Sequence, residues 1–183
     1  MLLAFRRDGD PSPQALQVAA QVALTQQVRS GLRSLLRDAQ VQHQLTPAGL
    51  SQLAALESTA AMVQQLGCEL TATDLPRLVV ELLLLLLGPM VRDLRRLAQP
   101  ASGSSSESAP PGPVQAGNAA RWEPVLRLLR ISQVPLGLKL NLEQAQEQLY
   151  EALRPLPVSQ WPEAERTLAR ALGLAVPQSF GPG

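Results

Sequence analysis

The sequence predicts an all-α fold, a helical bundle of five to six helices around a central leucine-rich helix. Hydrophobic residues make up 45% of the 183 residues and aromatic residues only 3%, so a core must be built from leucine, valine and alanine. Such a composition favours helix over strand, because strands prefer β-branched and aromatic residues. Apolar residues recur at helical spacing, and the run Leu78–Val91 is apolar on every side of a helix. A helix of this kind must be buried, so it is placed at the centre.

Each of the first two helices is predicted to begin with a capping residue followed by proline. The first opens at Ser12-Pro13 and is predicted to stop near Asp38. The second opens at Thr46-Pro47 and ends at Leu66-Gly67, where the glycine is expected to adopt a left-handed cap.

The leucine-rich helix is predicted from about Leu75 to Leu97, with Thr73 or Asp74 as its cap. Pro89 is expected to kink this helix or to split it in two, because its ring clashes with the preceding turn. A bilayer span needs about 20 consecutive apolar residues. Glu81 and Pro89 interrupt this run, so the helix is interpreted as the core of a soluble bundle rather than as a membrane element.

The composition then changes at a stretch rich in proline, serine and glycine, residues 99–118. This stretch has almost no residue able to enter a core, and it is predicted to be a flexible linker or a disordered insertion. It separates a three-helix core, residues 12–98, from a C-terminal helical segment, residues 119–177. The second segment either packs on the core or is tethered to it.

Three further helices are predicted in the C-terminal segment. The first carries Trp122 and must have Pro124 in its first turn. The next opens at Asn141, which resembles a weak capping box. The last starts at residues 159–162 and ends at Gly173. No sheet is predicted.

The chain offers little for chemistry. His43 is the only histidine and Cys68 the only cysteine, so neither a usual zinc site nor an intramolecular disulfide can form. They are interpreted as a solvated loop residue and a half-buried structural thiol.

No phosphate-binding loop, metal motif or cofactor motif is found, so no cofactor is predicted. A net charge of +1 gives no reason to predict nucleic-acid binding. A cytoplasmic location is the default expectation.

Glu81 is the one carboxylate inside the apolar run. It must find a partner, reach solvent or have a raised pKa. It is interpreted either as a general acid or polar hook for a partner, or as a structural group. In the second case it pairs with Arg29, Arg33 or Arg77, or escapes to the surface.

The expected function is that of a non-catalytic helical interaction or accessory module. Short helices are not expected to cover the leucine helix completely, and an uncovered part favours a protein partner or a homodimer. Leu83, Leu86 and Glu81 are the candidate partner-binding residues on this helix, together with Trp122 and Trp161 in the aromatic-containing C-terminal third. The alternative is a peripheral membrane protein that uses the apolar run and its arginine flank.

Residues 124–177 also resemble the helical C-terminal region of some bacterial family 57 glycoside hydrolases. The matching pattern is Asn-Leu-x-x-Ala-Gln-x-x-x-Tyr, carried here by Asn141, Leu142, Ala145, Gln146 and Tyr150. The resemblance covers less than a third of the chain. It implies a helical accessory part of a carbohydrate-active enzyme whose catalytic barrel is on another chain, because this chain has no room for a barrel. No catalytic residue is carried over.

Overall fold

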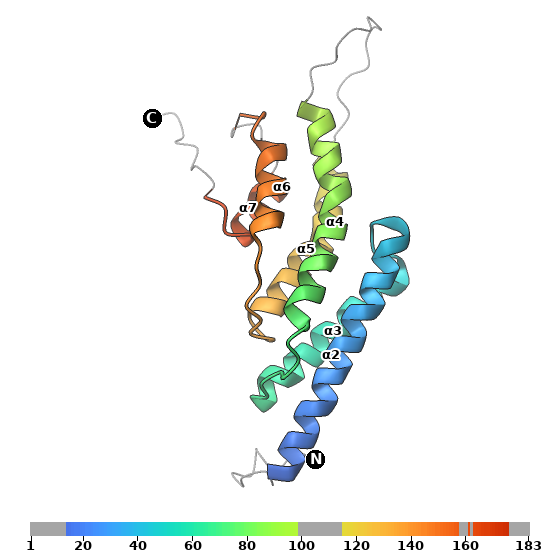
Figure 1. Ribbon diagram of the computed structural model, residues 1–183. Helices are drawn as coiled ribbons and strands as arrows, with labels where there is room; N and C mark the ends of the chain where they lie inside the picture. The colour runs from blue at the N-terminus through green and yellow to red at the C-terminus, as the bar shows by residue number, and fades with distance from the viewer. Residues whose placement is uncertain (1–13, 99–114, 158–160, 162, 176–183) are drawn as a thin grey trace, which may run out of the picture.

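The computed structural model describes residues 14–98, 115–157, 161 and 163–175, and within these ranges the chain forms six helices and no strand. The predicted all-α class is confirmed. In chain order the helices are α2 (Gln14–Gln42), α3 (Pro47–Leu66), α4 (Leu75–Ala98), α5 (Gln115–Gln133), α6 (Glu143–Leu153) and α7 (Glu163–Ala171). Helix α4 lies between the α2–α3 hairpin and the C-terminal helices (Figure 1), and it contacts α2, α5 and α6.

Helices α2 and α3 are joined by a short turn that both helices stabilise. The predicted N-cap is confirmed, because the Thr46 hydroxyl accepts a hydrogen bond from the Gly49 N–H at 3.2 Å. The Thr46 N–H and hydroxyl in turn donate to the Asp38 carboxylate at 2.9 and 2.8 Å. A Cβ at Gly49 would lie 2.0 Å from this carboxylate, so any other residue there would push the Asp38 side chain out of its position. Helix α2 continues to Gln42, beyond the predicted end near Asp38, so Asp38 contacts Thr46 from within α2.

The end of α3 also follows the sequence prediction. Gly67 has φ +60°, and its N–H donates to the Gln64 carbonyl at 3.1 Å. The Cys68 N–H donates to the Val63 carbonyl at 3.1 Å, which completes a left-handed helix cap. Cys68 is half-buried, as predicted.

Pro89 was predicted to kink or to split the leucine-rich helix, and the split is wrong, because α4 is continuous through Pro89. A proline removes one helical hydrogen bond. The residues on both sides of Pro89 are buried, namely Leu86, Leu87, Met90 and Val91. Their packing against the neighbouring helices stabilises α4 at this position. None of the helices in the described ranges has a stretch apolar and long enough for a membrane crossing.

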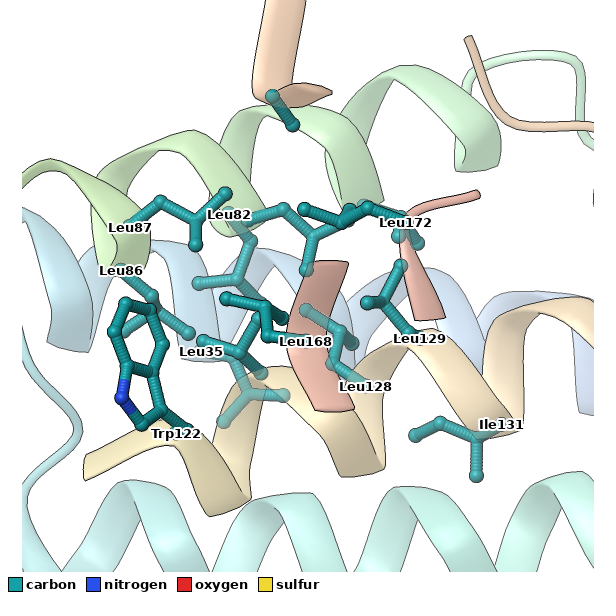
Figure 2. Close-up of a cluster of buried hydrophobic side chains, with 14 of the residues drawn as sticks. Leu35, Leu82, Leu86, Leu87, Trp122, Leu128, Leu129, Ile131, Leu168 and Leu172 are labelled. Carbon is teal, nitrogen blue, oxygen red and sulfur yellow. The ribbon is translucent and has the colours of Figure 1, made fainter. Parts of the chain in front are cut away.

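One buried apolar cluster joins both halves of the chain. It includes side chains from all six helices, such as Leu35 of α2, Leu82 of α4, Leu128 of α5 and Leu168 of α7 (Figure 2). The C-terminal segment therefore packs on the three-helix core and is not a separate unit joined only by a linker.

Two predicted helix starts are wrong. Helix α5 begins at Gln115, so Pro124 lies well inside it instead of in its first turn, and the first part of this helix was predicted as linker. Residues 99–114 of the predicted linker lie outside the described residues. At α6, Leu142 is the cap without a side-chain hydrogen bond, and Asn141 accepts from the Glu143 N–H in a local turn at 3.1 Å. The end of α7 was predicted correctly, since Gly173 has φ +82°.

Candidate interaction sites

Leu83 and Leu86 do not form the predicted partner-facing patch. Leu83 is 0% exposed and Leu86 is 2% exposed, and the chain itself covers them. The physical reason is that α4 is surrounded by α2, α5 and α6, and the core-facing side of α4 includes both leucines. Leu86 is nevertheless one of the residues that line a small surface pocket described below.

The two tryptophans also point inward. The indole N–H of Trp122 on α5 donates to Glu165 Oε1 on α7 at 3.1 Å. The indole N–H of Trp161 donates to the Leu156 carbonyl at 3.0 Å. Both rings are buried, so they anchor the C-terminal helices instead of presenting a binding surface.

Glu165 is a buried polar residue that sequence reasoning missed. It is 0% exposed, and its second oxygen, Oε2, has no hydrogen-bond partner among the residues that the structure describes. The burial of Glu165 could have been predicted from the helical spacing. It lies three residues before Leu168 and four before Ala169, and both of these share the buried face of α7.

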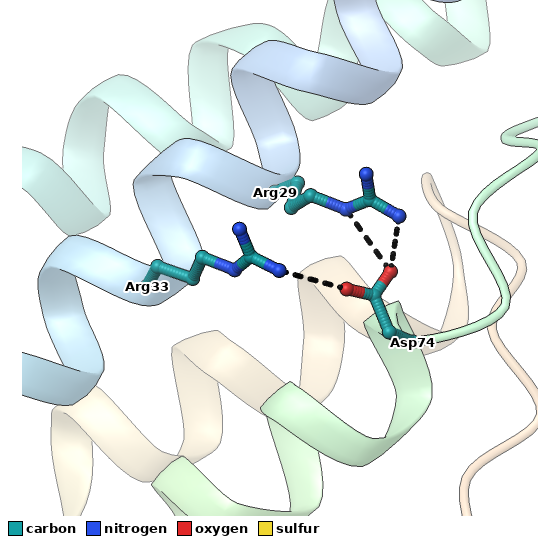
Figure 3. Close-up of polar contacts among 3 residues, drawn as sticks. All are labelled: Arg29, Arg33 and Asp74. Carbon is teal, nitrogen blue, oxygen red and sulfur yellow. Dashed lines mark hydrogen bonds and ion pairs between the residues drawn. The ribbon is translucent and has the colours of Figure 1, made fainter.

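Glu81 does not pair with Arg29 or Arg33, because Asp74 takes both arginines (Figure 3). Two nitrogens of Arg29 donate to Asp74 Oδ1 at 3.0 and 2.7 Å, and Arg33 donates to Oδ2 at 3.3 Å. The hydrogen bonds from Arg29 hold the pKa of the Asp74 carboxyl below its ordinary value of 3.8, against the opposing effect of desolvation. This contact fixes the start of α4 to the middle of α2, and it leaves Glu81 half-buried at the surface.

Glu81 lines an open cleft of about 670 Å³, which we call the polar cleft. One wall comes from the first turns of α4, and the other from the segment that leads into α6. The cleft has an apolar part, formed by Pro76, Val80 and Leu84, beside four charged and three neutral polar side chains: Arg77, Glu81, Lys139, Glu143, Thr73, Asn141 and Gln144.

A second, more apolar pocket of about 300 Å³ lies where the α2–α3 turn meets α4 and α5. We call it the proline pocket, because it is lined by Pro89 and Pro124, which lie beyond the first turns of α4 and α5. Its other apolar lining residues are Leu45, Leu50, Leu86, Met90 and Val125, and its polar lining residues are His43, Gln44, Arg121, Glu123 and Arg127.

Two ion pairs hold the arginines of the proline pocket. Arg121 pairs with Asp93 at 2.8 Å, and Arg127 binds both carboxylate oxygens of Glu57 on α3. The hydrogen bonds between Arg127 and Glu57 lower the pKa of the Glu57 carboxyl and raise the pKa of the Arg127 guanidinium. Desolvation by burial opposes both shifts. The charges of both arginines are therefore matched by carboxylates within the chain.

The described residues contain no cluster of three or more histidine, cysteine or acidic side chains able to hold a metal ion. His43 is exposed with φ +53° and lies at the edge of the proline pocket, while Cys68 lies apart from both sites. Compared with known proteins, the chain matches no family model, no curated protein and no solved structure.

Proposed function

We propose that this chain is a non-catalytic helical interaction module that receives an apolar side chain of a protein partner in the proline pocket. The observation that carries the proposal is the pocket itself, a hollow of about 300 Å³ lined mainly by apolar side chains and open at Leu50, which is 40% exposed. Binding hot spots are typically large side chains seated in such desolvated pockets and ringed by polar groups.

The framework around the pocket is suited to this role. Its walls come from three helices, and the Glu57–Arg127 pair ties α3 to α5 beside it. A pocket with fixed walls loses little conformational entropy on binding, which favours affinity. The partner's anchor is accordingly a leucine, methionine or aromatic residue on an amphipathic segment.

Site-specific photo-crosslinking in the cells that express the protein tests this proposal. A photoreactive residue at Leu50 is compared with one at Met62, which is on the same helix and 37% exposed but lies outside the pocket. We expect a discrete crosslinked protein at position 50 and none at position 62. Leu50→Glu should abolish binding of the identified partner, whereas Met62→Glu should not.

The same crosslink at both positions, or none at position 50, would overturn the proposal. A crosslink from position 50 to a second copy of this chain would place a homodimer interface at the pocket. It would contradict the proposal that the pocket binds a different protein. Light scattering on the purified protein then distinguishes monomer from dimer.

A further inference from the structure

The four charged side chains of the polar cleft differ from the arginines that hold the helices together elsewhere in the fold. Arg29, Arg121 and Arg127 all form ion pairs within the chain. By contrast, the side chains of Arg77, Glu81, Lys139 and Glu143 form no ion pair or hydrogen bond with any residue that the structure describes. Four charged groups therefore line one hollow without internal partners.

Both walls carry their charges in the same order along the sequence, a cation followed four residues later by an anion. Arg77 and Glu81 are four residues apart on α4, so they lie on one face of that helix. Lys139 and Glu143 are four residues apart on the segment that enters α6. Each wall thus presents one cation and one anion. A ligand with a single sign of charge meets a like charge on either wall, while a ligand with both signs finds a partner for each group.

We propose that the polar cleft binds a small zwitterion, namely an amino acid or a short peptide with a free ammonium and a free carboxylate. Arg77 and Lys139 receive the carboxylate, and Glu81 and Glu143 receive the ammonium. Val80 and Leu84 provide an apolar surface for an aliphatic side chain. The volume of about 670 Å³ is within the range of small-molecule sites. This site is separate from the proline pocket and does not depend on the proposed protein partner.

Leucine is the first probe, because it has both charges and an aliphatic side chain. It is compared with N-acetyl-leucine, which keeps only the carboxylate, and with leucinamide, which keeps only the ammonium. Binding is measured from the backbone amide chemical shifts of Val80 and Asn141 in a ¹H–¹⁵N spectrum of the full chain. We expect saturable shifts with leucine and affinity lower by about tenfold for either single-charge analogue, since each loses one ion contact in an open, solvent-screened cleft.

Two matched pairs of substitutions complete the test. Glu81→Gln and Lys139→Gln should each weaken leucine binding, while Glu147→Gln and Arg154→Gln, which change exposed charges outside the cleft, should leave it unchanged. Equal affinity for the three probes, tighter binding of a single-charge analogue, or no saturable shift with leucine at millimolar concentrations would overturn the proposal. The unchanged remainder of each spectrum shows that the variant is folded.

Discussion

Replacing Leu83 by alanine tests whether the leucine helix faces the core or a partner. Leu83 is 0% exposed, so the substitution removes three fully buried carbon groups. At about 0.8 kcal/mol for each group, the lost transfer free energy is roughly 2.4 kcal/mol. The cavity left behind raises the total to about 3–5 kcal/mol. We therefore expect a large loss of unfolding free energy in the isolated chain, without any partner present.

The assay is urea unfolding followed by far-ultraviolet circular dichroism. With a slope of roughly 2 kcal/mol per molar urea, the midpoint should fall by about 1.5–2.5 M. Leu84→Ala is the matched control, because Leu84 is the adjacent leucine but is half-buried beside the polar cleft, and its loss should cost only about 1 kcal/mol. Leu83→Met conserves volume and should lose less than about 1.5 kcal/mol, which gives a reading even if the alanine variant does not fold.

The reasoning would be refuted if Leu83→Ala and Leu84→Ala lost the same small amount of stability. Leu83 would then not lie in the core, and the sequence-based prediction of a partner-facing leucine would regain its support.

Three further predictions concern the polar contacts. Glu57 has a lowered pKa in the folded state, so its pair with Arg127 contributes stability above the ordinary pKa of 4.5 and loses it as the pH falls below that value. Acidification should therefore destabilise the wild type more than Glu57→Gln in urea titrations at neutral and acidic pH, by at most about 1 kcal/mol because the pair is partly exposed. Thr46→Ala removes the α3 cap and should cost about 1 kcal/mol in the same assay, and an unchanged midpoint would contradict the cap. Trp122→Phe keeps an aromatic ring but removes the indole N–H, which leaves both oxygens of the buried Glu165 without a partner among the described residues, so it should cost about 1–3 kcal/mol. Adding Glu165→Met to that variant should recover much of the loss, and no recovery would argue against the buried-carboxylate explanation.

The sequence alone determined the helical class and several helix ends. Thr46 caps α3, Gly67 ends it and Gly173 ends α7, all as predicted. These features are local, because a cap depends on the backbone conformation of a few consecutive residues. The central position of the leucine helix was also predictable, since a helix that is apolar on all sides is stable only when other elements surround it.

Only the tertiary structure decided which side chains meet. Arg29 pairs with Asp74 across 45 residues instead of with Glu81, which remains half-buried at the surface. Arg127 pairs with Glu57 across 70 residues. Leu83 and Leu86, predicted to face a partner, are buried in the core. Helices α4 and α5 continue through Pro89 and Pro124, and these two prolines line one pocket. Such outcomes depend on how elements distant in the chain pack together, and the periodicity of a single helix shows which face is apolar but not what covers it.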